Sequence, residues 1–318
     1  MSTGHSTPLP PSVPWSFAAV DPQETSLEEC RVVVVPVPYD ATASYRGGAR
    51  EGPKAIIEAS RHLEDYDIEL EREIYQMGIY TLPELEPHMG SPEGMVERVK
   101  AMVTPHARDG KLLAVLGGEH SVSVGVVKAL QGVNPDLSVL YLDAHGDLRD
   151  EYMGSGFSHA CTARRIWEMC PLVEVGVRSI SQEEMYFVRQ EGLKVHFHGV
   201  GGPTVSWDVE EVLKGLTERV YVSIDLDVFD PGLMPAVGTP EPGGPGWEAV
   251  LSLLRAVCKE RSVVGFDVVE LCPGAGPPSC AFIAAKLAYK VMGYATEREL
   301  KAESGLGPSI ETGDSRLH

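Results

Sequence analysis

The chain has 318 residues, and its 46 acidic residues outnumber the 27 basic ones, which gives a net charge of −19 at neutral pH. This balance excludes the basic footprint that nucleic-acid binding requires and favours a cationic ligand, while no stretch approaches the roughly 18 apolar residues of a membrane-spanning helix. The six cysteines form no C-x-x-C pair and the first twenty residues contain no Lys or Arg, so we expect reduced thiols and a cytoplasmic location.

Apolar runs typical of strands alternate with segments of helical periodicity along most of the chain. The first strand is predicted at 31–38, and Gly52-Pro53 begins the first helix, because the first helical position does not need the N–H that proline lacks. Further strands are predicted at 112–116, 138–142, 172–177, 194–198, 219–225 and 262–268. Further helices are predicted from Ser91-Pro92 onwards and at about 121–131, 161–169, 181–191, 208–216, 246–259 and 280–292. This repeated order predicts a parallel sheet with helices on both faces.

The two ends of the chain differ in composition from the part between them. Residues 1–28 are rich in Ser, Pro and Thr, and residues 301–318 are polar, so both are expected to be flexible. Residues 29–300 contain no linker and are predicted to form one α/β domain. Gly- and Pro-rich loops follow several strands and should surround a site at the carboxyl edge of the sheet; they are 39–52, 148–160, 228–246 and 270–280.

Side chains able to bind a metal follow three of the predicted strands. They are His120, Asp143, His145, Asp147, Asp225 and Asp227. Aspartate is depleted in strands, and a spacing of two residues points successive side chains to the same face of an extended chain. Because parallel strands bring their carboxyl ends to one edge of a sheet, the three groups are expected to meet there.

The composition of this set indicates which metal it would bind. Four carboxylates offset the charge of two divalent ions, and imidazole mixed with carboxylate oxygen favours Mn²⁺, with Ni²⁺, Co²⁺ and Zn²⁺ as alternatives. Two such ions roughly 3.5 to 4 Å apart lower the pKa of a shared water enough to make a nucleophile at neutral pH. The competing interpretation is that these are unrelated polar residues at strand ends, which three separate groups make improbable.

Four motifs together resemble the ureohydrolases, the arginase and agmatinase family. They are GGEHS at 117–121, DAHGD at 143–147, SIDLDVFDP at 223–231 and GTPEPGG at 238–244, and RGGAREGP at 46–53 and GFDVVELCP at 265–273 extend the resemblance. The resemblance implies a three-layer α/β/α fold with an eight-stranded parallel sheet and a binuclear Mn centre on the six residues named above. It also implies hydrolysis of a guanidino group to urea and an amine, in a homotrimer or homohexamer.

The loop after the second motif resembles the agmatinase branch of that family. Arginases read the α-carboxylate and amine of arginine with an S-G-N-x-H-G segment and an upstream Asn, whereas this chain has Phe157 and Arg149 at those positions. The resemblance therefore implies agmatine as the small cationic substrate, with urea and the polyamine putrescine as products. His159 is followed by Ala160 where many members have Gly, which leaves the geometry of this loop open.

Three further residues receive roles from the resemblance. Glu270 matches the glutamate that binds the guanidinium group, and a carboxylate can accept two parallel N–H bonds from it. His159 matches the proton shuttle, and Glu241 would meet the distal ammonium. Each also has a simpler interpretation, as a solvated strand end, a surface histidine and a structural loop residue respectively. Glu119 should face away from His120 and is expected to be structural.

Two other kinds of function are compatible with the same residues. Arg149 could bind a substrate carboxylate if it faces the pocket, and guanidinobutyrate, guanidinopropionate, free guanidine and formiminoglutamate are alternative substrates within the family. A non-catalytic regulatory protein that binds metal is the second alternative. It is disfavoured because a buried carboxylate cluster without cations has a high desolvation cost. A zinc deacetylase would need only one metal and leave half of the ligands unexplained.

Overall fold

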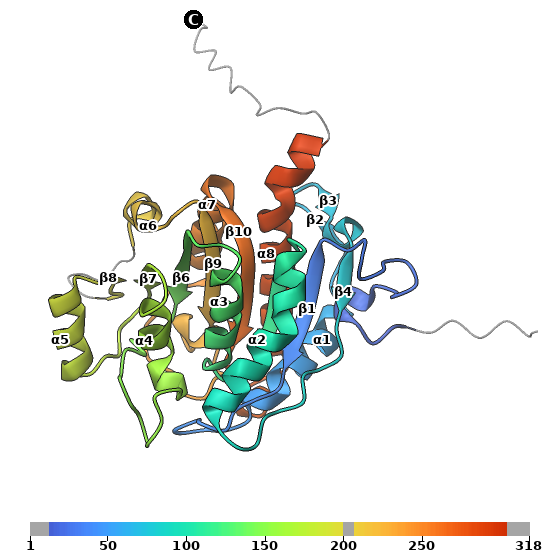
Figure 1. Cartoon of the computed structure of the whole chain (residues 1–318). Helices are drawn as coiled ribbons and strands as arrows, with labels where there is room; N and C mark the ends of the chain where they lie inside the picture. Colours follow the sequence, from blue (N-terminus) through green and yellow to red (C-terminus); the bar gives the residue numbers. More distant parts are fainter. Residues whose placement is uncertain (1–12, 200–206, 304–318) are drawn as a thin grey trace, which may run out of the picture.

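A parallel eight-stranded sheet forms the centre of the protein in the computed structural model, which describes residues 13–199 and 207–303 (Figure 1). Every neighbouring pair of strands runs parallel. The strands are, in the order in which they lie side by side, β4 (Ile79–Thr81), β1 (Val32–Val37), β5 (Leu112–Gly117), β10 (Ser262–Val269), β9 (Arg219–Asp225), β6 (Leu137–Leu142), β7 (Leu172–Val175) and β8 (Lys194–His196). The predicted fold class, three layers with an eight-stranded parallel sheet, is confirmed.

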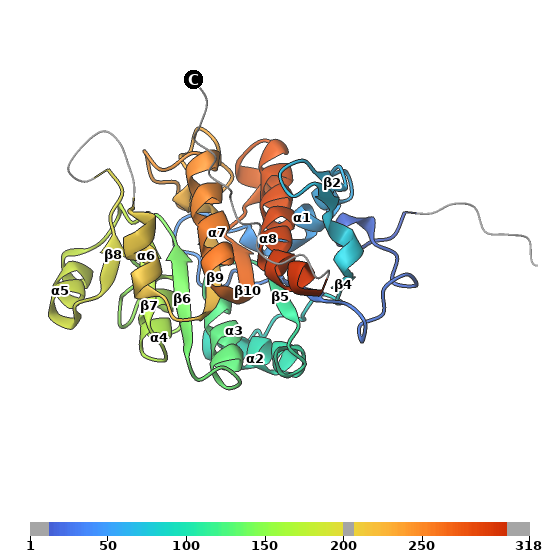
Figure 2. The same ribbon diagram turned by 90° about the horizontal axis from the view of Figure 1, so that it is seen from above.

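Helices cover both faces of the sheet (Figure 2). One face packs against α1 (Gly52–Ser60), α6 (Val209–Gly215), α7 (Trp247–Glu260) and α8 (Ser279–Glu303). The other packs against α2 (Pro92–Arg108), α3 (Val122–Gln131), α4 (Thr162–Trp167) and α5 (Gln182–Glu191). Short 3-10 helices lie at Phe17–Ala19, Ala49–Glu51, Ile74–Met77, His159–Cys161, Leu226–Val228 and Pro273–Ala275, and a small hairpin joins β2 (Tyr66–Asp67) to β3 (Arg72–Glu73).

Parts of the fold differ from the sequence-based prediction. The pattern predicts seven of the eight strands of the sheet and misses β4, as well as the hairpin strands β2 and β3, because segments of two or three residues are too short to show a period. Phe17 lies fully buried in the core although it belongs to the segment 1–28 that was expected to be flexible, so the packed part of the chain begins earlier than predicted. Residues 1–12 and 304–318 of the predicted flexible ends lie outside the described residues.

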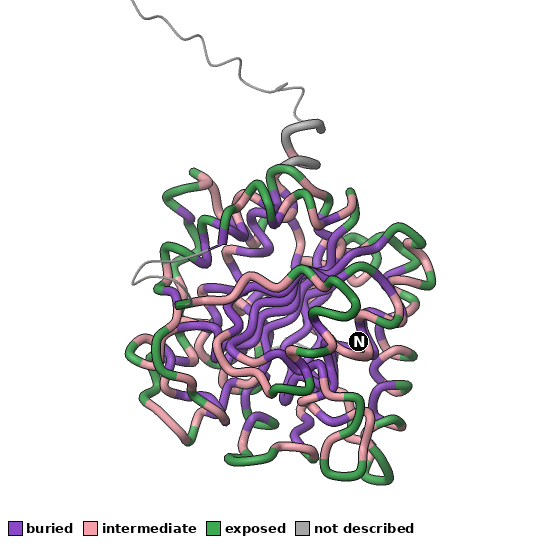
Figure 3. The backbone as a smooth tube through the Cα atoms, turned by 90° about the vertical axis from the view of Figure 1, so that its left-hand side faces the viewer, coloured by how far each residue is buried: buried purple, intermediate pink, exposed green. Residues whose placement is uncertain are grey.

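The strands form the buried centre of the molecule, and the exposed residues lie on the helices and loops around it (Figure 3). Strands β1, β5 and β6 are buried along their full length, because a parallel sheet covered on both sides has no solvent-facing side chains. Among the described residues, no helix combines the length and apolar character needed to cross a membrane.

Four neighbouring strands at the centre of this sheet, β5, β10, β9 and β6, end at one edge. The last residue of β9, Asp225, and the segments that follow these strands carry the six candidate metal ligands and Glu270. Residues that are up to 150 positions apart in the sequence therefore reach one place, as the hydrogen bond from the His120 backbone N–H to Glu270 shows.

Candidate active site

The six candidate ligands meet beyond the carboxyl edge of the sheet, as the spacing predicted. Nδ1 of His120 lies 3.0 Å from Oδ2 of Asp143, 3.2 Å from Oδ2 of Asp225 and 3.7 Å from Oδ2 of Asp147. Nδ1 of His145 lies 2.9 Å from Oδ2 of Asp227 and 3.5 Å from Oδ1 of Asp143. The structure thus brings together every residue of the predicted ligand set.

Only part of the backbone that positions these ligands is the extended strand assumed from the spacing: Asp225 ends β9 in an extended conformation, whereas Asp147 and Asp227 lie in turns. Strand β6 ends at Leu142, and Asp147 has a φ of 46°, in the left-handed region. Asp227 lies in a 3-10 helix, and its backbone N–H donates to Oδ1 of Asp225 at 2.8 Å. The convergence therefore depends on turns immediately after the strands, a detail that the alternation rule did not predict.

Burial and mutual repulsion determine the acid–base properties of the cluster. Burial raises the pKa of Asp147 and Asp227, and the carboxylate of Asp143 raises each of them further. Burial also raises the pKa of Asp225, with added repulsion from Asp227 and Asp143. For Asp143 the effect of burial is outweighed by the neighbouring imidazoles of His120 and His145, which lower its pKa. So much buried negative charge is costly unless protons or cations neutralise it.

The donor atoms suit two metal ions that share one ligand. His120, Asp143 and Asp147 form one compact group of donor atoms, and Asp143, His145 and Asp227 form another. Asp143 belongs to both groups, and its buried Oδ2 accepts no hydrogen bond of good geometry. Carboxylate oxygen with imidazole nitrogen is a suitable donor set for Mn²⁺, Co²⁺, Ni²⁺ or Zn²⁺.

Interactions on the far side of His120 fix the orientation of its ring. Its Nε2 lies 2.8 Å from Oγ of Ser223, which in turn donates to the carboxylate of Asp267 at 2.9 Å. Tyr141 stacks on the imidazole, with ring centroids 4.3 Å apart, and its hydroxyl donates to Asp147. These contacts leave Nδ1 facing the carboxylates. The sequence contained a signal for Asp267, an acidic residue inside the apolar run of β10, but not for its partners.

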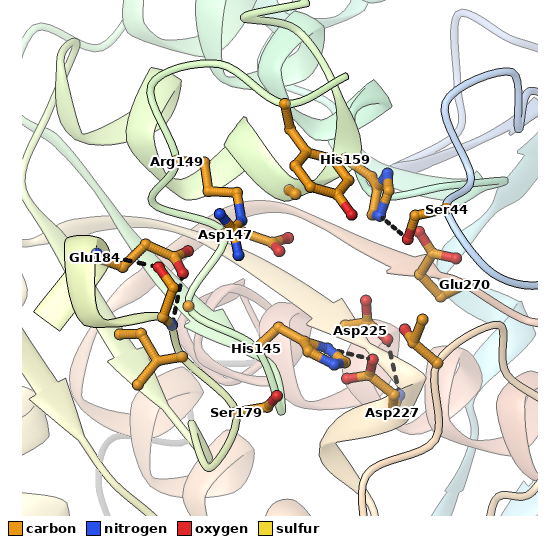
Figure 4. A pocket seen from close by; sticks show the side chains of 16 residues that line it. Ser44, His145, Asp147, Arg149, His159, Ser179, Glu184, Asp225, Asp227 and Glu270 are labelled. Atoms are coloured by element: carbon orange, nitrogen blue, oxygen red, sulfur yellow. Dashed lines mark hydrogen bonds and ion pairs between the residues drawn. The ribbon is translucent and has the colours of Figure 1, made fainter. Parts of the chain in front are cut away.

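A cavity of about 360 Å³ opens beside the ligands (Figure 4). Its walls include His145, Asp147, Asp225 and Asp227, so three of the four carboxylates of the cluster border it. Other residues along the walls come from distant parts of the chain: Ser44, Arg149, Tyr152, His159, Ser179, Glu184 and Glu270. The loops 39–52, 148–160, 228–246 and 270–280 all contribute to the walls, as predicted.

Glu270 reaches this cavity from a backbone conformation that is unusual for a residue with a side chain. Its φ is 65°, its N–H donates to the Gly118 carbonyl at 2.8 Å, and its Oε1 accepts the His120 N–H at 2.8 Å. Burial, followed by the negative charge of Glu119, raises the pKa of Glu270 to about 8. A cationic ligand beside this carboxyl group would favour its ionised form.

His159 lies across the cavity from the ligands, in the 3-10 helix His159–Cys161. Its Nε2 is 3.2 Å from Oγ of Ser44, and its Nδ1 is 3.3 Å from Oγ1 of Thr42. Burial lowers the pKa of His159 to about 4, so the ring is neutral at neutral pH. The sequence pattern identified the histidine but not its two hydroxyl neighbours in the loop 39–52.

Glu241 lies at the edge of the site, with Oε1 3.7 Å from Nε2 of His145 and its side chain about one third exposed. Arg178 holds this loop in place, because its guanidinium donates to the carbonyls of Glu241, Asp227 and Phe229. The loop that carries Glu241 is thereby tied to the segment that carries the ligand Asp227.

The two residues that distinguish this loop from the arginase pattern lie in different places. Arg149 lines the cavity and stacks on Tyr152, 5.1 Å from the ring centroid, while the neighbouring Asp150 pairs with Arg165 instead. Phe157 packs under the Lys128 ammonium, 5.2 Å from the ring centroid. Arg149 is therefore placed to influence which substrates enter the cavity.

The chain belongs to the arginase family, whose pattern matches residues 30–293, and it is an agmatinase-like ureohydrolase and therefore a hydrolase. It is 42% identical to the N(1)-aminopropylagmatine ureohydrolase of Synechocystis sp., over 87% of this chain and 93% of that protein. It is 39% identical to the agmatinase of Pyrococcus horikoshii, over 84% of this chain and 93% of that protein. The crystal structure of the agmatine ureohydrolase of Thermoplasma volcanium superposes with a TM-score of 0.78 at 32% identity, covering 91% of this chain and 96% of the other.

Proposed function

We propose that the protein releases urea from agmatine and leaves putrescine as the second product. The observation that carries this proposal is a cavity that borders the ligand cluster and is also lined by Glu270 and His159. A metal-binding cluster, an acceptor for a planar cation and a proton carrier are the three components that guanidine hydrolysis needs. The names of the similar proteins support an agmatine moiety as substrate.

The six ligands would hold two Mn²⁺ ions, which would supply Lewis acidity and lower the pKa of water at the site. Glu270 accepts N–H bonds from the guanidinium group with Oε2, because Oε1 already accepts the His120 N–H, and this orients the central carbon. His159 passes a proton to the leaving nitrogen through Nε2. Glu241 attracts the ammonium at the other end of the substrate.

N(1)-aminopropylagmatine is a second candidate substrate, and the names of the relatives that are 42% and 40% identical favour it. It differs from agmatine by an aminopropyl arm on the nitrogen far from the guanidino group. The arm would extend from the cavity towards Glu241 and adds a further positive charge. Both substrates yield urea, so they share the chemistry and differ only in how the tail is recognised.

Urea release from the Mn-loaded protein, measured as kcat/KM, tests the proposal. The panel contains agmatine, N(1)-aminopropylagmatine, arginine, guanidinobutyrate, guanidinopropionate, guanidine and formiminoglutamate. We expect turnover of agmatine and none of arginine. If kcat/KM for N(1)-aminopropylagmatine exceeds that for agmatine tenfold or more, N(1)-aminopropylagmatine is the substrate instead of agmatine. Turnover confined to guanidinobutyrate or guanidinopropionate, and lost in Arg149→Ala, would overturn the proposal and assign Arg149 to the substrate carboxylate.

A further inference from the structure

Glu119 is fully buried beside the ligand His120, and its carboxylate accepts three hydrogen bonds. The backbone N–H of Thr42 donates to Oε2 at 2.7 Å, the hydroxyl of Thr42 donates to Oε1 at 2.6 Å, and the hydroxyl of Ser121 donates to Oε1 at 2.7 Å. Glu119 therefore fixes both the backbone and the side chain of Thr42, and none of these three hydrogen bonds involves a residue of the ligand cluster.

The bond to Glu119 determines what the Thr42 hydroxyl can offer to its other neighbours. A hydroxyl has one proton to donate and two lone pairs that accept. The proton is committed to Glu119, so Oγ1 can only accept from His159. It accepts the His159 backbone N–H at 2.9 Å and faces Nδ1 of the same residue at 3.3 Å. An unprotonated Nδ1 would place two lone pairs against each other, so this contact favours a proton on Nδ1.

The other ring nitrogen of His159, Nε2, is then free to accept a proton. With the proton on Nδ1, Nε2 of the neutral ring carries the lone pair, and it lies 3.2 Å from Oγ of Ser44 at the wall of the cavity (Figure 4). The hydroxyl of Ser158, 3.4 Å from Nδ1, could stabilise the opposite tautomer by donating there. Ser158 can rotate and accept instead, whereas Thr42 cannot donate, so Thr42 decides the tautomer.

We propose that Thr42, held by Glu119, is a positioning residue that keeps neutral His159 in the Nδ1–H tautomer, so that Nε2 exchanges protons with the substrate. The inference rests on the proposed role of His159 as proton carrier. Thr42 contacts the imidazole and acts through it. Ser44, which touches Nε2 from the cavity side, orients the same nitrogen towards the substrate.

The proton transfers balance with Nε2 as the reacting atom. An O–H bond of the attacking water breaks as the Nε2–H bond forms, which gives an imidazolium that retains its Nδ1 proton against Thr42. The Nε2–H bond then breaks, and the leaving nitrogen takes this proton together with the electron pair of the C–N bond. The second water proton follows when the urea carbonyl forms, so the amine leaves as an ammonium ion.

Substitutions at Thr42 test the positioning role through kinetics. Thr42→Val keeps the shape of the side chain but removes the hydroxyl, and we expect kcat to fall about tenfold to hundredfold with little change in KM. Thr42→Ser should restore most of kcat. Ser121→Ala is the matched control, because it removes a hydrogen bond to the same carboxylate without touching His159. An unchanged kcat in a folded Thr42→Val protein would overturn the proposal.

A direct measurement of the tautomer separates this inference from the proposed function. Long-range ¹H–¹⁵N spectra of metal-free protein labelled at histidine, with the His159 signals assigned from His159→Asn, report which ring nitrogen carries the proton. We expect Nδ1–H in the native protein and a shift towards Nε2–H in Thr42→Val. Nε2–H in the native protein would overturn the inference even if His159→Asn abolishes turnover. If His159→Asn instead leaves kcat unchanged, His159 is not the proton shuttle. The spectra still test the tautomer assignment independently of that result.

Discussion

At the scale of single residues, Asp143 holds the most consequential position in the site because both ligand groups contain it. Asp143→Asn removes the charge of the shared ligand, whereas Asp227→Asn removes a ligand that belongs to one group. We expect Asp143→Asn to lower the metal content by nearly two ions per chain and Asp227→Asn by about one. Turnover should fall by at least about a thousandfold in Asp143→Asn.

Elemental analysis after dialysis gives the metal content, and far-UV circular dichroism checks that each variant is folded. Equal metal loss in the two variants would argue against a shared ligand. An Asp143→Asn variant that keeps both ions would show that the assignment of these carboxylates is wrong.

Glu174 on β7 is a second buried carboxyl group, and neither of its oxygens accepts a hydrogen bond. Burial raises its pKa well above the ordinary value, and the charges of Asp143 and Asp147 raise it further. A raised folded-state pKa means that the native protein favours the protonated form of this carboxyl group more strongly than the unfolded chain does. Its stabilising effect is fully present below the unfolded-state pKa and is lost as pH rises through the folded-state pKa.

Glu174→Gln should therefore become more stable relative to the native protein as pH rises, because glutamine cannot ionise. Unfolding by urea at a series of pH values, on metal-free protein, measures this difference in free energy. Glu183→Gln makes the same substitution at an exposed position on α5 and serves as the matched control. A difference for Glu174→Gln that does not grow with pH would contradict the assignment of a neutral carboxyl group.

At the scale of elements, the end of β5 depends on a close approach that only glycine permits. A Cβ on Gly118 would lie 1.9 Å from the carbonyl oxygen of Tyr39, and backbone atoms cannot move aside as a flexible side chain would. The Gly118 carbonyl also accepts the N–H of Glu270. Gly118→Ala should destabilise the protein by about 3 to 5 kcal/mol and displace both His120 and Glu270.

The matched control for this change is Gly246→Ala at the N-terminus of α7. Gly246 has a φ of −83°, and a Cβ there would meet nothing within 4 Å. Gly246→Ala should lower the free energy of unfolding by no more than about 1 kcal/mol, because its only expected effect is that alanine is a weaker N-cap than glycine. Thermal and urea unfolding of both variants measure the difference, and similar costs for the two would refute the steric explanation.

The sequence predicted the fold and the ligand set because both depend on local patterns. Seven strands and the main helices follow from runs and periods of apolar residues, and the ligands follow strands at spacings of two. The missed features depend on contacts between distant segments. Thr42 is 117 residues from His159, and Ser223 is 103 residues from His120. No local pattern marks a hydroxyl that is placed to orient an imidazole.

At the scale of the whole molecule, the fold places carboxyl groups that repel one another close together in its interior. The four carboxylates of the ligand cluster are buried at the carboxyl edge of the sheet, where their charges lie close together. Stability and metal binding are therefore coupled, since an ion that binds the folded chain and not the unfolded one stabilises the folded state. The identity of the ions as Mn²⁺ and the assembly of the chain into homotrimers or homohexamers stay predictions, the latter to be tested by light scattering.

Removal of the metal should accordingly lower the melting temperature. Each ion present at a hundred times its dissociation constant raises the free energy of unfolding by about 2.7 kcal/mol, so two ions raise it by roughly 5 kcal/mol. For a domain of this size that corresponds to a decrease of roughly 10 °C or more on chelation, reversed by Mn²⁺. Differential scanning calorimetry measures the shift, and Asp143→Asn should respond to neither chelator nor Mn²⁺. A native protein that loses its ions by elemental analysis yet melts at the same temperature would show that the buried carboxylates are neutralised by protons, with no need of a cation.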